Sequence, residues 1–232
     1  MMYRQSKTDF IGLICLLSLP AQAQEFHVQP YLQDTHPTST VIMWETSYGS
    51  ESLVEWGPTE LLGQTSSGVA DLSAGSARIH TVELTGLEAN QNYYYRVRTE
   101  TAVSEIHRFR TPSERPDEAN TRLVAMSDMQ RDSRQPQMFR EVINEGVIGH
   151  IRDQHGAELS DHVDLVMIAG DLVDNGQRID EWRETFFAPA AALFAEVPLY
   201  PVPGNHERDS PRFFSYFHLP ENGSFGLEEH WW

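Results

Sequence analysis

Cysteine and lysine are almost missing from this sequence of 232 residues. Each occurs once, as Cys15 and Lys7, and both lie within the first 23 residues. A chain with a single cysteine cannot form an internal disulfide, so its stability has to come from a packed core. Long apolar runs are also scarce, and the run from Ile11 to Leu19 is shorter than the roughly 20 residues that a membrane-spanning helix needs. We therefore expect no transmembrane segment.

Positive charge is scarce as well. The 17 basic residues are outnumbered by 34 acidic ones, and the formal net charge is −17. A surface of this charge repels polyanions, which argues against a nucleic-acid scaffold or an anionic membrane as the main partner. A metal cation or a neutral partner is more compatible with it. Nothing in the sequence specifies an oligomeric state.

The first 23 residues have the layout of a secretory signal peptide. Arg4 and Lys7 precede the apolar run, and Ala21-Gln22-Ala23 supplies the small residues of a cleavage site. Ile14, which precedes the cysteine, is too bulky for cleavage of the lipoprotein type. We therefore expect a bacterial protein that is secreted or periplasmic and that has no lipid anchor.

Residues 25–112 have the pattern of an all-β domain. Short stretches rich in β-branched and aromatic residues alternate with Gly, Pro, Asn and Ser, without a helical period. We expect strands at Tyr31–Gln33, Thr40–Glu45, Leu53–Trp56, Ile79–Leu84, Tyr93–Thr99 and Ile106–Arg110. Short strands at this spacing predict a β-sandwich. The turn from Leu84 to Leu87, followed by Tyr93, resembles the fibronectin type III pattern, in which a tyrosine closes a corner of the sandwich.

A change of pattern separates this domain from the rest of the chain. Residues 113–120 are polar and contain proline, which predicts a linker. After it, we expect strands at Leu123–Met126, Leu165–Ala169 and Leu199–Val202, with helical spacing in each interval. Alternation of strands and helices predicts an α/β domain with a parallel sheet over residues 121–232, in which the first strand is buried.

Polar residues follow each of these three strands. They are Asp128 and Gln130 after the first, Asp171 and Asp174 after the second, and Asn205, His206 and Glu207 after the third. The carboxyl ends of parallel strands meet at one edge of the sheet, so we expect these side chains to converge there. Oxygen and nitrogen donors without a thiolate suit Fe, Mn, Zn or Mg, and a carboxylate such as Asp171 can bridge two ions. The combination predicts a two-metal hydrolase.

The same residues resemble the motifs of a known family. Gly170-Asp171-x-x-Asp174 and Gly204-Asn205-His206-Glu207, after Asp128-x-Gln130, are similar to the motifs of calcineurin-like metallophosphoesterases. In the first half, the similarity is to the fibronectin-like domain that precedes the catalytic domain of purple acid phosphatases. It is carried by Pro30 to Gln33, Pro37 to Trp44, Val54 to Gly57 and His80 to Leu87.

This resemblance implies an acid phosphatase-like hydrolase that acts on a small phosphate ester with two divalent or trivalent metal ions. It implies that Asp128 binds the first metal, that Asp171 bridges both and that Asn205 binds the second. Gln130 would be a weaker additional metal ligand. His206 would be the catalytic histidine, which stabilises the transition state or protonates the leaving group.

Two further residues, Asp174 and Glu207, would orient the ligands. The sequence departs from the family at three places. Asp174 stands where purple acid phosphatases have a metal-binding tyrosine, so we expect neither the purple colour nor a firm preference for iron. Gln130 stands where other members have histidine or glycine. No Gly-His-x-His motif occurs before Trp232, so we expect the sequence to stop before the second half of the catalytic sheet.

Two alternatives stay open at this point. A phosphodiesterase or a nucleotidase would use the same residues. In the other alternative, the sandwich is an adhesion or binding module attached to a degenerate hydrolase domain. The remaining histidines do not supply the missing ligands, because we expect His27, His36, His80 and His107 on the surface of the sandwich and His150, His155 and His162 on a solvated face.

Overall fold

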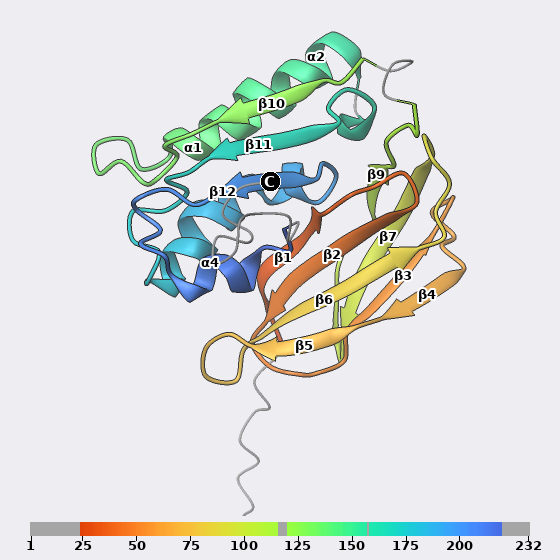
Figure 1. Ribbon diagram of the computed structural model, residues 1–232, viewed down its shortest axis with the longest axis horizontal. Helices are drawn as coiled ribbons and strands as arrows, with labels where there is room; N and C mark the ends of the chain where they lie inside the picture. Colours follow the sequence, from red (N-terminus) through yellow and green to blue (C-terminus); the bar gives the residue numbers. More distant parts are fainter. Residues whose placement is uncertain (1–23, 116–119, 157, 220–232) are drawn as a thin grey trace, which may run out of the picture.

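The computed structural model describes residues 24–115, 120–156 and 158–219, so the expected signal peptide and residues 116–119 of the expected linker lie outside the described residues. The described chain forms a β-sandwich followed by an α/β region (Figure 1). This arrangement confirms the predicted fold class. No helix in the described segments combines the length and the apolar character that crossing a membrane would require.

The sandwich consists of two antiparallel sheets. One has the order β1 (Phe26–Gln33), β2 (Ser39–Thr46), β6 (Arg78–Thr85) and β5 (Val69–Leu72). The other has the order β4 (Gln64–Ser67), β3 (Leu53–Gly57), β7 (Asn92–Thr99) and β8 (Ala102–Val103), and β9 (His107–Arg110) also pairs with β7. All six predicted strands are present, whereas β4, β5 and β8 were not predicted.

Aromatic residues dominate the core between the two sheets. Trp44 and Tyr95 are completely buried there, and Tyr93 accepts a hydrogen bond from the backbone N–H of Glu88 at 2.9 Å. That bond closes the corner of the sandwich in the way the sequence pattern predicts. The prediction for His80 was wrong, because its ring is buried and stacked on Trp44 at a centroid distance of 4.9 Å. Burial lowers the pKa of His80 to about 4.

The sheet that contains β1, β2 and β6 is buried on both faces. Ile42 and Trp44 face the sandwich core, whereas Val41 and Met43 belong to the apolar cluster of the α/β region. From Thr40 to Thr46 every residue of β2 is therefore buried. The α/β region thus covers a sheet face that a free-standing sandwich would expose to water.

The α/β region contains a parallel sheet in the order β10 (Leu123–Met126), β11 (Leu165–Ala169) and β12 (Leu199–Val202), with the predicted bounds. The first crossover contains α1 (Met138–Glu141), η2 (Val142–Gly149), α2 (His150–His155) and η3 (Leu159–Asp161). The second contains η4 (Glu181–Phe187) and α3 (Ala188–Phe194), and α4 (Pro211–Tyr216) follows β12. Because strands adjacent in sequence are also adjacent in the sheet, right-handed crossovers place both helical segments on one face.

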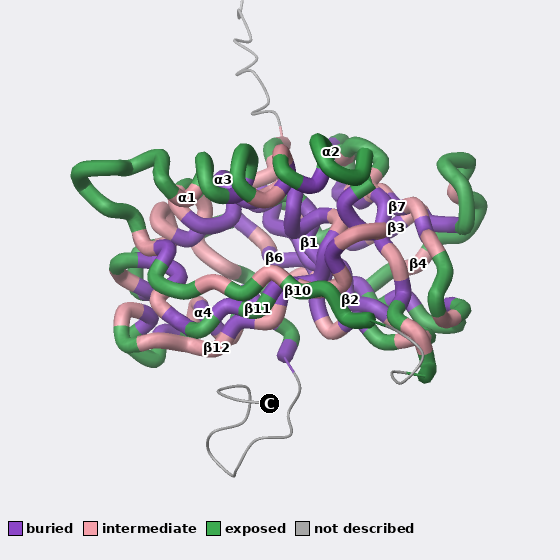
Figure 2. The backbone as a smooth tube through the Cα atoms, turned by 90° about the horizontal axis from the view of Figure 1, so that it is seen from above, coloured by how far each residue is buried: buried purple, intermediate pink, exposed green. Residues whose placement is uncertain are grey.

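The other face of this sheet is open in the described part of the chain. Leu123 on β10 is 50% exposed and Met167 on β11 is 40% exposed, and the two side chains lie on the same face. Residues of β10 are exposed or half-buried throughout (Figure 2). The prediction of a buried first strand was therefore wrong, because the described residues supply cover for only one face.

Polar contacts fix the sandwich to the α/β region. Arg183 on η4 forms a bidentate ion pair with the carboxylate of Glu45 on β2, with both N–O distances at 2.7 Å. Tyr31 donates its hydroxyl proton to the carbonyl of Tyr216 at 2.6 Å, and Tyr95 donates to the carbonyl of Ala195 at 2.7 Å. The carboxylate of Glu45 is completely buried, so its charge is compensated inside the domain interface.

Candidate active site

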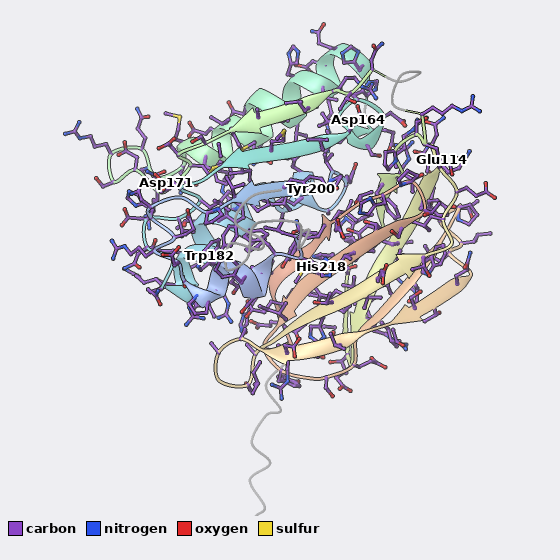
Figure 3. The ribbon with its side chains drawn as sticks, in the orientation of Figure 1. Glu114, Asp164, Asp171, Trp182, Tyr200 and His218 are labelled. Carbon is purple, nitrogen blue, oxygen red and sulfur yellow. The ribbon has the colours of Figure 1, made fainter. Side chains whose placement is uncertain are left out.

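Three loops meet at the carboxyl edge of the parallel sheet, where the arrows of β10, β11 and β12 end in Figure 1. Asp171 lies at this edge in Figure 3. The first two loops are joined directly, because the backbone N–H of Asp128 donates to the carbonyl of Gly170 at 3.4 Å. Ser127 also donates its hydroxyl proton to the carbonyl of Ala169 at 3.4 Å. The edge predicted from the sequence is therefore formed.

The two aspartates that follow β10 and β11 share an unusual backbone conformation. Asp128 has φ 56° and Asp171 has φ 54°, both in the left-handed region that residues other than glycine seldom adopt. Such conformations persist only where the surrounding structure enforces them, and they concentrate at functional sites. Asp128 is exposed, and its carboxylate accepts a short hydrogen bond from the hydroxyl of Ser127.

Glycines allow the second and third loops to approach each other closely. Gly170 has φ 87°, and a Cβ atom built on it would lie 2.9 Å from the Cα of Gly204. A Cβ atom on Gly204 would collide with the backbone nitrogen and the carboxylate of Asp171. Because neither glycine has a side chain, Asp171 can lie directly against the loop that carries Asn205 and His206.

A single buried carboxylate connects these two loops. Glu207 is completely buried, and its Oε1 accepts backbone N–H bonds from Leu172 at 2.8 Å and from Val173 at 3.3 Å. Its Oε2 accepts backbone N–H bonds from Asp171 at 3.0 Å and from Gly204 at 2.6 Å. One side chain therefore accepts four hydrogen bonds, which fix the backbone from Asp171 to Val173 against that of Gly204.

The end of the second loop is held by two residues that sequence reasoning did not assign to the site. Trp182 donates its indole N–H to the carbonyl of Gly176 at 2.8 Å, and Ser210 donates its hydroxyl proton to the same oxygen at 2.8 Å. The sequence pattern predicts Trp182 only as an apolar residue on the buried side of a helix. Its indole N–H is the one feature of the sequence that indicates a buried polar partner.

His206 is held in a defined tautomer. Its Nδ1 lies 2.9 Å from the carbonyl oxygen of Asp174, which can only accept a hydrogen bond, so Nδ1 carries a proton. Its backbone N–H donates to Oδ1 of Asp171 at 3.0 Å. The carbonyl of Asp174 raises the pKa of His206, and the carboxylates of Asp171, Asp174 and Glu207 act in the same direction. Nε2 is therefore the ring atom available to exchange a proton.

Comparison with known proteins assigns both regions to families. Residues 26–111 match the model of the purple acid phosphatase N-terminal domain, and residues 121–230 match the model of the calcineurin-like phosphoesterases. The second part of the chain is therefore similar to the calcineurin-like phosphoesterases, and the first part is similar to the N-terminal domain of purple acid phosphatases. A search of curated proteins found no match.

Two solved structures have a fold similar to that of this chain. Purple acid phosphatase PPD1 from yellow lupin (Lupinus luteus) seeds is 22% identical with a TM-score of 0.58, and the alignment covers 84% of this chain and 36% of that one. PhoD is 16% identical with a TM-score of 0.54, and the alignment covers 80% of this chain and 40% of that one. The chain thus spans well under half the length of either neighbour. At these identities the two neighbours show a shared fold.

The donor atoms at this edge fit part of a metal site. Asp128 and Asp171 supply carboxylate oxygens, and the buried Oε1 atom of Gln130 has no hydrogen-bond partner among the described residues. Oxygen donors of this kind suit hard or intermediate ions. Over residues 24–115, 120–156 and 158–219, no three His, Cys, Asp or Glu side chains form a group that could hold a metal ion. The described residues therefore do not by themselves form a complete set of such ligands.

The predicted site residues differ in how exposed they are and in how they are connected to one another. Asn205 is exposed next to His206, and the carboxylate of Asp174 is 64% exposed at 3.5 Å from Nδ1 of His206. Hydrogen bonds connect Asp171, His206 and Glu207 directly, whereas Asp128 joins them through the backbone of Gly170. The predicted roles of these residues remain predictions.

Proposed function

We propose that the protein containing this chain is an acid phosphatase-like phosphomonoesterase with a dinuclear metal centre. The observation that carries this proposal is the position of His206. Its tautomer is fixed by Asp174 and its backbone by Asp171, at the strand edge that also presents Asp128. The matching phosphoesterase family over residues 121–230 supports the same reaction class.

Asp128, Asp171 and Asn205 would hold the metal ions, with Asp171 between the two and Gln130 as an additional ligand to the first. Ions of Fe, Mn or Zn bound there would neutralise charge on the phosphoryl oxygens and acidify a water molecule. Glu207 does not contact the substrate in this mechanism. It holds the backbone of Asp171 and Gly204 in place, so that the carboxylate of Asp171 needs no rearrangement when the site is loaded.

The reaction replaces one P–O bond with another. Oxygen from water bonds to phosphorus as the bond to the leaving oxygen breaks, water loses a proton and the leaving oxygen gains one. His206 would supply that proton from Nε2, because Nδ1 keeps its own proton on the carbonyl of Asp174. The histidine acts as a general acid in this scheme.

The first test removes Asp171 and His206 separately in the full-length protein. We expect Asp171→Asn and His206→Ala to lower kcat/KM on 4-nitrophenyl phosphate by about 10²-fold or more, as is usual for groups of this kind. Asp153→Asn, which changes an exposed aspartate on α2, is the matched control and should leave the rate unchanged. Full activity in both site variants would exclude this assignment.

A second comparison tests the role of His206 as an acid. Nitrophenolate can leave without being protonated, whereas an alkoxide needs a proton as it leaves. We therefore expect His206→Ala to lose more activity on an alkyl phosphate than on 4-nitrophenyl phosphate. An equal loss on both substrates would show that the histidine only positions the substrate. Rates on bis(4-nitrophenyl) phosphate measure the diesterase alternative in the same assay.

The first 23 residues support export of the protein. We propose that it works outside the cytoplasm, secreted or in a bacterial periplasm. Mass spectrometry of the mature N-terminus would test this, since cleavage after Ala23 is expected. A mature protein that retains Met1 would contradict it.

A further inference from the structure

A cleft of about 510 Å³ lies beside Asp128, on the helix-covered side of the sheet. The loop that connects β10 to α1, which Figure 2 shows as exposed, contributes Asp128 and Gln130 to one wall, and Glu184, Thr185 and Pro189 of the second crossover also line the cleft. A volume of this size accommodates a drug-sized organic group. None of the residues assigned above to the metals or to proton transfer explains why this space is open.

Apolar side chains line the interior of this cleft. Three are methionines, Met126, Met129 and Met138, and Phe139 lies next to them. The ring of Phe139 is stacked on Phe186 at a centroid distance of 6.1 Å, which holds it in place. Thioether groups are polarisable and make favourable contacts with aromatic rings. The lining therefore suits a ring better than a flexible alkyl chain.

Two arginines add a second feature that favours a ring. Arg131 and Arg140 line the cleft, and neither forms an ion pair among the described residues. The carboxylates of Asp132 and Glu184 also line it, so the cleft as a whole does not select a negative charge. A guanidinium group stacks on an aromatic face in this kind of mixed environment.

We propose that this cleft binds an aromatic leaving group of the phosphate ester. The inference rests on the proposed function, because the phosphoryl group would lie at Asp128 and the ring would extend into the cleft. The substrate class is then an ester whose alcohol part carries an aromatic ring, as in a phenol ester. Met126, Met129 and Met138 surround the ring, and Arg131 and Arg140 lie against it.

Methyl NMR on the full-length protein tests this without turnover. The protein is labelled with [¹³C-methyl]methionine and titrated with phenylphosphonate, which has no ester bond to hydrolyse. We expect upfield ring-current shifts at Met126, Met129 or Met138. Met43, which is buried between the sandwich and the α/β region, and Met167, which lies on the open sheet face, are internal controls and should not shift. Met138→Leu and Met167→Leu assign the corresponding signals.

Cyclohexylphosphonate is the matched ligand, because it has the same charge and a similar size but no aromatic ring. We expect it to bind the cleft more weakly and to give no ring-current shift. Arg140→Gln should weaken phenylphosphonate about two- to fivefold, as expected for the loss of one cation–π contact. Arg152→Gln makes the same change at an exposed arginine of α2 outside the cleft, and it should leave the affinity for phenylphosphonate unchanged.

Equal binding of the two phosphonates would overturn the aromatic class, and shifts at Met167 alone would overturn the location. Absence of any shift would overturn the site itself. These outcomes differ from failure of the proposed function, which would appear as absence of hydrolysis in the metal-loaded protein while the methyl shifts persist.

Discussion

The domain interface and the active-site loops each contain a completely buried glutamate, and the two are stabilised in different ways. Glu45, in the interface, is paired with the guanidinium of Arg183 and also accepts a hydrogen bond from Tyr216 at 3.1 Å. Glu207, in the loops, has no cationic partner among the described residues and accepts four backbone N–H bonds instead.

The difference follows from what each carboxylate connects. Glu45 joins two domains through side chains, and its partner lies 138 residues away in the sequence. Glu207 joins two loops through their backbones, and its nearest donor is only three residues away. Backbone donors fix the course of the chain itself, which is what a site needs to hold its ligands in place. A charge pair fixes only the distance between two surfaces.

Removal of Arg183 should have the largest effect on stability. Arg183→Met leaves the charge of Glu45 buried without a cation, which typically costs about 3–5 kcal/mol of unfolding free energy. Urea denaturation of the single variant measures this loss. The double variant Glu45→Met/Arg183→Met is the control and should recover most of it, because a buried ion pair can usually be replaced by apolar groups. A loss below about 1 kcal/mol in the single variant would contradict the assigned role of the pair.

Substitution of Glu207 should lower the free energy of unfolding less than Arg183→Met does, but its effect should be concentrated at the candidate active site. Glu207→Gln turns one carboxylate oxygen into an NH₂ group that faces N–H donors, so two hydrogen bonds are lost, at a cost of about 2–4 kcal/mol. Hydrogen exchange should show lost protection at the amides of Asp171 and Gly204, with the interface amides unchanged. Glu145→Gln, at an exposed carboxylate on η2, is the matched control. Uniform loss of protection would show that Glu207 acts globally, as Glu45 does.

A third glutamate, Glu196, is less fully compensated than Glu45 or Glu207, and its substitution should have the smallest effect on stability. Glu196 has a buried Oε2 without a hydrogen-bond partner among the described residues, and burial together with the nearby carboxylate of Glu158 raises its pKa to about 7. Between pH 4.5 and 7 the folded state keeps a proton that the unfolded state has lost, so the free energy of unfolding falls as pH rises.

Glu196→Gln removes this titration. The variant should match the parent near pH 4 and exceed its stability by about 1–2 kcal/mol at pH 8, after allowance for partial exposure to solvent. Thermal unfolding at both pH values, with Glu141→Gln as an exposed control, measures the difference. A constant difference at all pH values would show that packing, and not ionisation, is responsible.

The sequence predicted the parts of the fold that local patterns specify. The strands β10, β11 and β12 were predicted with their correct bounds, because each is an apolar run that ends at polar residues. The positions of Asp128, Asp171 and His206 at the sheet edge were predicted for the same reason, since each follows one of these strands, and their roles stay predictions. By contrast, β4 (Gln64–Ser67) consists of polar residues and becomes a strand through pairing with β3.

Long-range contacts explain the remaining failures. Burial of His80 depends on Trp44 and on two hydroxyls, Thr46 and Ser52, that hydrogen-bond its ring nitrogens at 2.8 Å. Trp182 holds the second loop through a backbone carbonyl, and no residue pattern marks such a bond in advance. These features exist only once distant segments have been packed together, so no local pattern contains them.

The sheet of β1, β2 and β6 that is buried on both faces has a consequence for how the chain folds. Val41 and Met43 would face water in an isolated sandwich, and the helices of the α/β region would lose the surface on which they pack. The two domains should therefore melt together in a single calorimetric transition, with a van't Hoff enthalpy that matches the total enthalpy of both. The two regions match different family models, but we expect them to unfold as one cooperative unit.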